Sequence, residues 1–219
     1  MLKFDNLTVR YGTQTVIDRL TFEIPEHRIL AITGASGIGK TTLLNVIAGL
    51  KAPDGGRLLS SAPHCAYIFQ EPRLFPWMTA LENVEFPLVF KRVRPKRRRK
   101  LAKDMLHRVG LGNRMSHKPK EMSGGQQQRV GIARAFVSEP EIVFADEPTG
   151  NLDTKTTIEV MEMIKRMAKE KHQTIVMVTH DQSLASYADK VIHILDGKIQ
   201  SIEVAEQEEQ EENESKEVS

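Results

Sequence analysis

The sequence predicts an α/β protein with a central, mainly parallel sheet, an antiparallel β subdomain at the N-terminus and an inserted helical subdomain. Three mainly apolar runs, at 29–32, 142–145 and 174–179, are typical of strands buried on both faces of a parallel sheet. Alternating residues before position 25 predict the antiparallel strands. From 71 to 121 the chain changes to prolines and helical spacing, which predicts the insertion.

The 219 residues have the composition of an ordinary globular protein and suffice for one large domain with a real core. The single cysteine, Cys65, excludes an internal disulfide and fits a reducing compartment. No stretch resembles a signal peptide or is apolar for long enough to span a bilayer. We therefore expect a cytoplasmic protein and leave open a peripheral position on the inner face of the cell membrane.

The net charge of +2 conceals two charged blocks. Residues 91–103 hold nine Lys and Arg without an acid, and the chain from Glu203 onward holds eight Glu against Lys216. The near-neutral total argues against a general nucleic-acid binder. The basic block is either an RNA or anionic-lipid patch or a solvated helix face. We favour the solvated face, because Pro95 interrupts the block and no aromatics interleave with it. The acidic tail at 205–219 lacks apolar periodicity, and we expect it to be disordered.

The strongest motif fits the phosphate-loop pattern G-x-x-x-x-G-K-[ST], between the apolar run at 29–32 and a helical segment. Its residues are Gly34, Ala35, Ser36, Gly37, Ile38, Gly39, Lys40 and Thr41. Glycines let backbone N–H groups curl around phosphate oxygens, and the helix N-terminus adds the positive end of its dipole. Lys40 is placed to reach the β- and γ-phosphates, and the Thr41 hydroxyl to bind Mg²⁺. A flexible Gly-rich turn is the alternative, but both flanks favour a P-loop NTPase fold and a nucleotide site.

Two carboxylates, Asp146 and Glu147, follow the apolar run at 142–145. Both would be costly to bury without a partner. Beside a phosphate loop they have a use, since Asp146 can hold Mg²⁺ and Glu147 can polarise the attacking water as general base. A structural pair that caps the strand end is the alternative.

Three further residues stand at strand ends. His180 follows the run at 174–179, level with the carboxylates, where it either contacts a γ-phosphate or is a structural histidine. Gln70 leaves a short strand predicted at 66–69, at a position where ligands sit in α/β sheets, although such a residue is more often a cap or turn. Tyr11 ends an N-terminal strand and has no assigned role from its position alone.

The run Ser123, Gly124, Gly125 and Gln126 precedes a helical segment and completes a capping box, with Gln126 three residues after the N-cap serine. Capping alone does not require two adjacent glycines. Glycines at a helix N-terminus open the backbone to an anion, so this is a candidate second phosphate contact. A plain capped helix is the alternative.

The C-terminal third contains a helix and a hairpin. Asp196-Gly197 predicts a turn between strands at 190–195 and 198–204. The helix after Asp153 carries an apolar stripe at helical spacing, which indicates core packing and not a metal or cofactor site. Its members are Ile158, Met161, Ile164, Met167 and Ala168.

Together these residues resemble the ATP-binding subunit of an ABC transporter, and the resemblance covers 1–204. The motifs that carry it occur in the family's order: the phosphate loop, Gln70, Ser123-Gly124-Gly125-Gln126, Asp146-Glu147, Asn151-Leu152-Asp153 and His180. The resemblance implies hydrolysis of ATP with Mg²⁺ in a head-to-tail dimer that holds two ATPs between its subunits. The dimer partner is a second copy or a paralogous ATPase subunit. Integral-membrane permease subunits and a substrate-binding protein are further partners that it implies.

The resemblance also implies roles for single residues. Ser123, Gly124, Gly125 and Gln126 contact the γ-phosphate held by the other subunit's loop. Tyr11 matches the aromatic that stacks on adenine, and Thr42 the position beside the α-phosphate. Gln70 joins Thr41 and Asp146 at the metal, while His180, Gln70 and Lys40 join Glu147 in catalysis. Asp153 belongs to the loop that communicates between the two sites.

The signals for a subfamily conflict. Residues 69–77 resemble the nitrate, sulfonate and taurine importers, whereas 146–153 resemble the lipoprotein-releasing and macrolide-exporting group. The segment after Gln70 contacts membrane subunits in this family, so we expect import of a small anion or organic solute, with export or lipoprotein release as the alternative. Met122 replaces the family's leucine, a change of similar volume that we expect to be tolerated.

Two classes outside transport compete with this interpretation. The first is an ABC ATPase that acts on ribosomes or DNA, which the single ATPase half and the absence of a long coiled-coil insertion disfavour. The second is a division-linked scaffold that binds ATP, which intact catalytic residues do not exclude. The sequence names no transported substrate.

Overall fold

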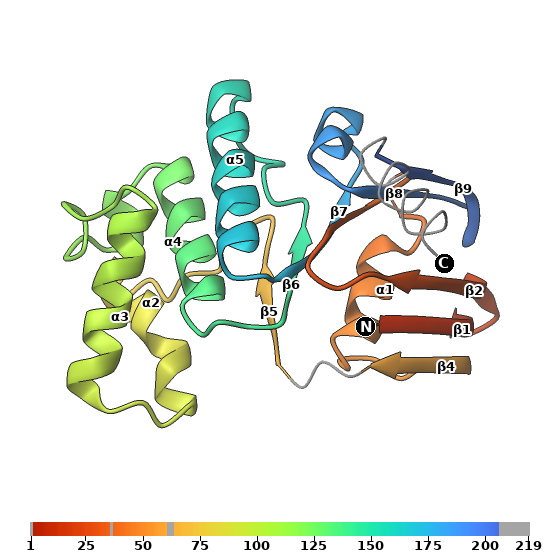
Figure 1. Ribbon diagram of the computed structural model, residues 1–219, viewed down its shortest axis with the longest axis horizontal. Coiled ribbons are helices and arrows are strands. Elements are labelled where there is room, and N and C mark those ends of the chain that lie inside the picture. Colours follow the sequence, from red (N-terminus) through yellow and green to blue (C-terminus); the bar gives the residue numbers. More distant parts are fainter. Residues whose placement is uncertain (1, 36, 61–63, 206–219) are drawn as a thin grey trace, which may run out of the picture. The chain divides into compact units, whose positions relative to one another are not determined.

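The computed structural model describes residues 2–35, 37–60 and 64–205 (Figure 1). The predicted phosphate-loop residue Ser36 and the acidic tail after Ala205 lie outside the described residues. The chain divides into two compact units. We name Met1–Pro63 with Thr174–Ser219 the loop unit, and His64–Gln173 the helical unit.

An antiparallel sheet in the order β2-β1-β4 opens the loop unit, as predicted. Its strands are β1 (Leu2–Tyr11), β2 (Gln14–Ile24) and β4 (Gly55–Ser60). The sequence alternates at 2–4 and at 7–10, which predicts two strands around Asp5-Asn6, but β1 is one strand that continues through Asn6. Asn6 adopts a left-handed φ of 52° at a shift of register, which keeps the strand paired. The Phe4 and Phe22 rings stack 4.2 Å apart inside this sheet, so its inner face forms part of the core.

The loop unit also holds the parallel strands that position the phosphate loop. β3 (Ile29–Thr33) lies between β7 (Thr174–Thr179) and β8 (Lys190–Leu195), and it is parallel to both. All residues of β3 and β7 are buried, which confirms strands covered on both faces. β9 (Lys198–Val204) returns antiparallel to β8 across the Asp196-Gly197 turn, which confirms the predicted hairpin. The helical elements of this unit are α1 (Lys40–Ile47) and the 3₁₀ segment η2 (Gln182–Tyr187).

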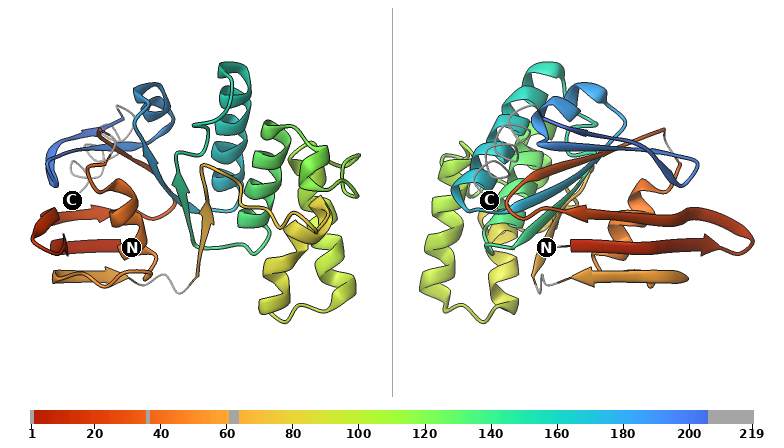
Figure 2. Two further views of the ribbon diagram at one scale, coloured as in Figure 1. Left: turned by 180° about the vertical axis from the view of Figure 1, so that it is seen from behind. Right: turned by 45° about the vertical axis from the view of Figure 1, so that its right-hand side comes forward.

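The helical unit pairs β5 (Cys65–Ile68) in parallel with β6 (Ile142–Asp146). Its helices are α2 (Ala80–Phe90), α3 (Pro95–Arg108), α4 (Gly124–Phe136) and α5 (Thr154–Glu170), with the 3₁₀ turn η1 at Pro119–Glu121. α2 and α3, yellow to green in both views of Figure 2, lie side by side. α2 packs against α4 as well, so these helices form one bundle.

Prolines affect this bundle less than the sequence indicated. α2 continues through Pro87, because a Thr79 cap with Glu82 fixes its start and the face with Val84 and Leu88 is buried. The apolar spacing predicts a helix from Lys100 to Val109, but α3 begins five residues earlier, at Pro95. Proline fits the first helical position, where its missing N–H has no intrahelical partner in any case.

Most of the basic block, from Lys96 to Lys103, lies on α3, whose buried side is Ala102, Met105 and Leu106. Arg98 donates to Glu85 at 2.7 Å, and Lys91, which precedes the helix, donates to the Ser138 carbonyl, so these two members of the block have partners within the helical unit. Along α5, Met161, Ile164, Met167 and Ala168 are buried as core residues, which confirms the stripe there. Ile158 was predicted as a member of the same stripe, but it is 50% exposed, so the prediction is wrong for this residue. In the part of the chain that the structure describes, no helix is both long and apolar enough to cross a membrane.

Candidate functional site

The phosphate loop connects β3 to α1 in the loop unit. Its glycines adopt backbone conformations that other residues resist, with φ of 153° at Gly34, 84° at Gly37 and 101° at Gly39. A Cβ at Gly34 would lie 2.5 Å from the Ile194 carbonyl oxygen, and a Cβ at Gly39 would lie 2.4 Å from the Val16 Cγ1. The loop is therefore tightly packed at Gly34 and Gly39, whereas a Cβ at Gly37 would meet no atom within 4 Å, so the loop is open there, as a phosphate cradle requires.

Lys40 begins α1 and is only 7% exposed. Its ammonium donates to the loop's own carbonyls, at 2.8 Å to Gly34 and 2.9 Å to Ala35. Thr41 and Thr42 follow in the first turn of the same helix. A buried cation inside a curled backbone, at a helix N-terminus, suits a polyphosphate.

Tyr11 and His180 are the other predicted site residues of the loop unit. Tyr11 is 52% exposed, and the Lys51 Nζ lies 4.6 Å from the centre of its ring, a cation–π contact that the sequence did not indicate. β3 and β7 pair Thr33 with Thr179, so His180 follows at the level of Gly34. The next residue, Asp181, caps η2 by accepting from the Ser183 N–H at 2.8 Å. The Ser183 hydroxyl, followed by this N–H, holds the pKa of Asp181 below its usual value.

The predicted carboxylates lie in the helical unit at the carboxyl end of β6. Asp146 is the last residue of the strand, and Glu147 follows with a left-handed φ of 47°. Such a conformation is strained for a residue with a Cβ and is common at functional sites. The Glu147 carbonyl accepts from the Gly150 N–H at 3.1 Å, which closes a tight turn. Burial, followed by the Asp146 carboxylate, raises the pKa of the Tyr67 hydroxyl.

Gln70 lies beside this turn. β5 and β6 pair Ile68 with Ala145, so Gln70 and Glu147 are level at the ends of neighbouring strands. A Cβ at Gly150 would lie 3.0 Å from the Gln70 Nε2, so the amide rests against the turn that follows Glu147. The structure therefore brings Gln70, Asp146 and Glu147 to one edge of the helical unit.

Gln128, a residue of α4 that the sequence did not single out, holds this edge together. It is 2% exposed, and its amide donates to the Phe69 carbonyl at 3.1 Å and to the Pro148 carbonyl at 2.6 Å. Phe69 precedes Gln70, and Pro148 follows Glu147. The only sequence signal was a glutamine on an otherwise apolar helix face. Its role could not be predicted, because the Phe69 and Pro148 carbonyls that it bonds are far from it in the chain.

Replacing Gln128 by Leu, which keeps the volume but removes both donors, is expected to lower the free energy of unfolding by about 1–3 kcal/mol. The kcat for ATP should fall at least about tenfold, because the turns that carry Gln70 and Glu147 lose their common anchor. Steady-state kinetics and denaturant unfolding check both values. Asn83→Leu is the control, since the buried Asn83 amide holds the Phe75 and Thr79 carbonyls in the bundle. It should lose similar stability and keep its kcat; an equal loss of kcat would contradict a specific role for Gln128.

The capping box at the start of α4 is confirmed. The Ser123 Oγ accepts from the Gln126 N–H at 3.3 Å, and the Gln126 Oε1 accepts from the Ser123 N–H at 3.1 Å. The two glycines differ, because a Cβ at Gly124 would meet no atom within 4 Å, whereas at Gly125 it would lie 2.9 Å from the Thr156 Cγ2. Gly124 therefore leaves the helix N-terminus open.

Gly125 links that N-terminus to the loop that contains Asp153. Asp153 caps α5 by accepting from the Thr156 N–H at 3.0 Å and from the Thr156 hydroxyl at 2.7 Å. These bonds lower the pKa of the Asp153 carboxyl. The Thr156 methyl in turn packs on Gly125, so the two motifs are parts of one packed segment.

The predicted residues thus fall into two sets. The loop unit carries Tyr11, the phosphate loop, Thr42 and His180, and the helical unit carries Gln70, Ser123–Gln126, Asp146, Glu147 and Asp153. No three His, Cys, Asp or Glu side chains of the described residues gather into a metal cluster. The donors predicted for Mg²⁺ are instead a hydroxyl, an amide oxygen and one carboxylate. That hard oxygen set fits Mg²⁺, which keeps phosphate and water ligands besides.

Comparison with known proteins gives one consistent family. Residues 17–150 match the family described as "ABC transporter". An uncharacterized ABC transporter ATP-binding protein, MJ1508 of Methanocaldococcus jannaschii, is 42% identical over 92% of this chain and 99% of its own length. The lipoprotein-releasing system ATP-binding protein LolD of Geobacter metallireducens is 40% identical over 91% of this chain and 97% of its own.

Two further matches extend the comparison. The macrolide export ATP-binding/permease protein MacB of Pasteurella multocida is 39% identical over 91% of this chain, which spans 34% of that longer protein. Among solved structures, the dimeric ATP-binding cassette MJ0796 bound to ADP and Pi superposes with a TM-score of 0.83. It is 36% identical, and the match covers 93% of this chain and 98% of that one.

Proposed function

Since this chain belongs to the ABC transporter family and is an ATPase, we propose that it powers a separate membrane-spanning permease of the export or lipoprotein-release type. The observation that carries the proposal is that one chain holds both a glycine cradle around buried Lys40, in the loop unit, and a strand-end Asp146-Glu147 pair, in the helical unit, with Glu147 in a left-handed conformation. The cradle suits the phosphates of ATP, and the carboxylates suit the hydrolysis of its terminal bond.

Export is favoured over the import that residues 69–77 indicated. Relatives named for lipoprotein release and macrolide export match over nine-tenths of this chain, and 146–153 resemble the same group. The structure offers a physical reason to give 69–77 less weight. Arg134 donates to the Pro72 carbonyl at 2.6 Å and to the Arg73 carbonyl at 2.8 Å, so this segment is also constrained by packing inside its own unit. Its sequence is then a weaker indicator of the membrane partner.

Hydrolysis follows from the chemistry of the two sets of residues. Thr41, Gln70 and Asp146 supply the oxygen donors that suit Mg²⁺, which when bound with the nucleotide draws charge from the phosphate oxygens. Glu147 accepts a proton from the attacking water as general base, with His180 and Gln70 orienting the water and the γ-phosphate. Lys40 stabilises the negative charge that develops on the transferred phosphoryl group.

A head-to-tail dimer would complete each site. The open N-terminus of α4 at Ser123–Gln126 would meet the γ-phosphate that the other subunit's loop holds, while Tyr11 stacks on adenine and Thr42 lies beside the α-phosphate. The dimeric form of the solved relative supports this assembly. In the proposed complex the chain binds peripherally to the inner face of the membrane through its permease.

The proposal is tested by recovering the membrane-spanning partner and by measuring the direction in which the complex transports its substrate. The tagged chain should copurify from detergent-extracted membranes with a polytopic protein, and the reconstituted complex should couple ATP hydrolysis to outward movement or release of its substrate. Recovery with an extracytoplasmic binding protein, together with ATP-driven uptake, would restore import and reject export. Salt-sensitive copurification with RNA, and no membrane protein, would reject transport altogether.

A further inference from the structure

The β8–β9 hairpin lies against the first glycine of the phosphate loop, and it reaches the last glycine indirectly through Val16 of β2. The Ile194 carbonyl of β8 occupies the space that a Cβ at Gly34 would need, at 2.5 Å. At the hairpin turn, a Cβ at Gly197 would lie 2.5 Å from the Val16 carbonyl oxygen, and the Asp18 N–H donates to the Gly197 carbonyl at 2.9 Å. The same Val16 packs on Gly39 at the other end of the loop. Any displacement of the hairpin therefore reaches the loop through backbone contacts.

The backbone ladder that should hold this part of the hairpin is interrupted. The last pair between β3 and β8 joins Thr33 to His193. Between β8 and β9 the register shifts directly after His193, before the pair that joins Ile194 to Ile199. Ile194, which supports Gly34, thus lies where pairing on one side ends and pairing on the other side is irregular.

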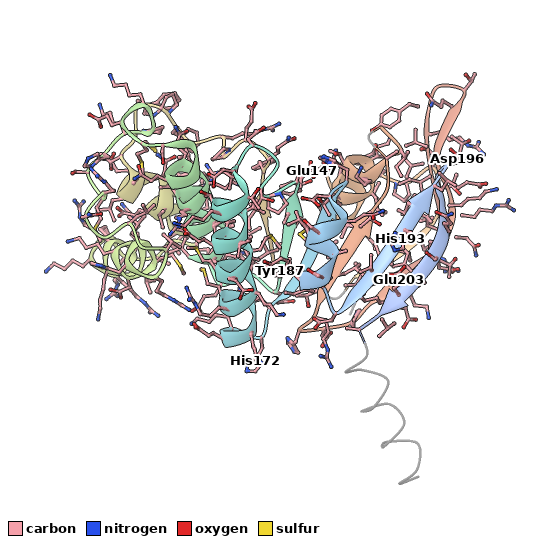
Figure 3. The ribbon with its side chains drawn as sticks, turned by 90° about the horizontal axis from the view of Figure 1, so that it is seen from above. Glu147, His172, Tyr187, His193, Asp196 and Glu203 are labelled. Atoms are coloured by element: carbon pink, nitrogen blue, oxygen red, sulfur yellow. The ribbon has the colours of Figure 1, made fainter. Side chains whose placement is uncertain are left out.

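The His193 side chain spans this interruption. Its Nδ1 lies 2.6 Å from the Thr33 Oγ1 of β3, and its Nε2 lies 3.1 Å from the Glu203 Oε1 of β9. A carboxylate only accepts, so Nε2 carries a proton towards Glu203, and the Thr33 hydroxyl, which can donate or accept, makes the bond to Nδ1. Figure 3 shows His193 and Glu203 on the two strands of the hairpin, with Asp196 at its turn. One ring therefore ties three strands together.

The bond between His193 and Thr33 acts at the start of the phosphate loop. Thr33 is 3% exposed and is the residue immediately before Gly34. We infer that His193 is a positioning residue of the phosphate loop: it fixes the β8–β9 hairpin to β3 and so holds the loop in the shape that binds the phosphates of ATP. The inference rests on the proposed placement of ATP at this loop.

His193→Ala removes both bonds, and we expect it to raise the Kd for MgADP, measured by calorimetry, and the KM for ATP by about fivefold each. The kcat at saturating ATP should stay within about twofold, because the catalytic side chains are unchanged and bound nucleotide restores the loop. His193→Asn, whose shorter amide can still meet Thr33, should recover most of the affinity. Glu203→Gln keeps an acceptor for the ring N–H and should bind as the parent does, whereas Glu203→Ala should weaken binding by about twofold.

Ile192→Val is the matched control, because Ile192 is fully buried on the same strand and has no polar bond to lose. It should lower the melting temperature and leave the Kd unchanged. The inference is overturned if His193→Ala keeps the parent Kd for MgADP. It is also overturned if Ile192→Val, at the same loss of stability as His193→Ala, raises that Kd by as much. Should His193→Ala fail to fold, the Glu203 pair decides, since Glu203 is on the surface. Lys40→Ala tests the proposed ATP site independently of His193. If this variant binds MgADP as well as the parent does, the nucleotide binds elsewhere and the proposed site itself is wrong.

Discussion

Glu147→Gln is expected to lower the kcat for ATP hydrolysis at least about a hundredfold while ATP still binds, because the amide cannot accept the proton of the attacking water. The phosphate loop and the metal donors are untouched, so the dimer closed around ATP should accumulate. Single-turnover kinetics measures the loss of hydrolysis, and gel filtration in the presence of ATP detects the accumulated dimer. Normal turnover would remove Glu147 from the role of general base.

Two variants distinguish chemistry from local structure at this position. Glu141→Gln removes a carboxylate at the other, exposed end of β6 and should leave kcat unchanged. Glu147→Gly relieves the left-handed backbone strain and should stabilise the fold by about 1 kcal/mol, yet be as inactive as the Gln variant. A Gly variant that loses stability would show that the Glu147 side chain supports the fold as well.

Lys40→Ala is expected to raise the Kd for ATP about a hundredfold, because a charge-assisted contact with the phosphates is lost and no other cation lies inside the curl of the loop among its described residues. Two loop carbonyls, those of Gly34 and Ala35, also lose their donor. Lys40→Arg keeps the charge but places a wider group in a site that is 7% exposed, so it should recover little.

Calorimetric titration with MgATP measures both Lys40 variants. Lys3→Ala removes an exposed cation from β1, where it pairs with Glu23, and is the control for net charge. Binding by Lys40→Ala that equals the control would place the phosphates away from this loop.

Local sequence rules predicted much of the site. The phosphate loop, the Ser123 capping box and the Asp196-Gly197 turn are specified by neighbours within a few residues, so pattern and spacing suffice for them. Apolar runs that end in polar residues likewise predicted the buried strands and the position of Asp146 and Glu147. The structure confirms the capping box, the hairpin turn and the buried strands, and it places Asp146 and Glu147 at the end of one of them, whereas phosphate binding by the loop stays a prediction.

Other features depend on residues far apart in the chain. Gln128 matters because two turns, at Phe69 and Pro148, present carbonyls to it, and His193 matters because β3 and β9 flank its strand. No local pattern encodes such partners. The start of α3 at Pro95 was missed for a simpler reason, since a proline that interrupts a basic block is also a good first residue of a helix.

The contact of Gly125 with Thr156 bears on the timing of the two hydrolysis events. Asp153, Thr156 and Gly125 are packed in series, so the loop beyond Glu147 and the N-terminus of α4 are in direct contact. In a head-to-tail pair these two ends serve different nucleotides. In the proposed dimer, release of the product of a subunit's own cleavage would then move the group that this subunit lends to its neighbour. Correlated rather than independent hydrolysis at the two sites would follow from the packing of one chain.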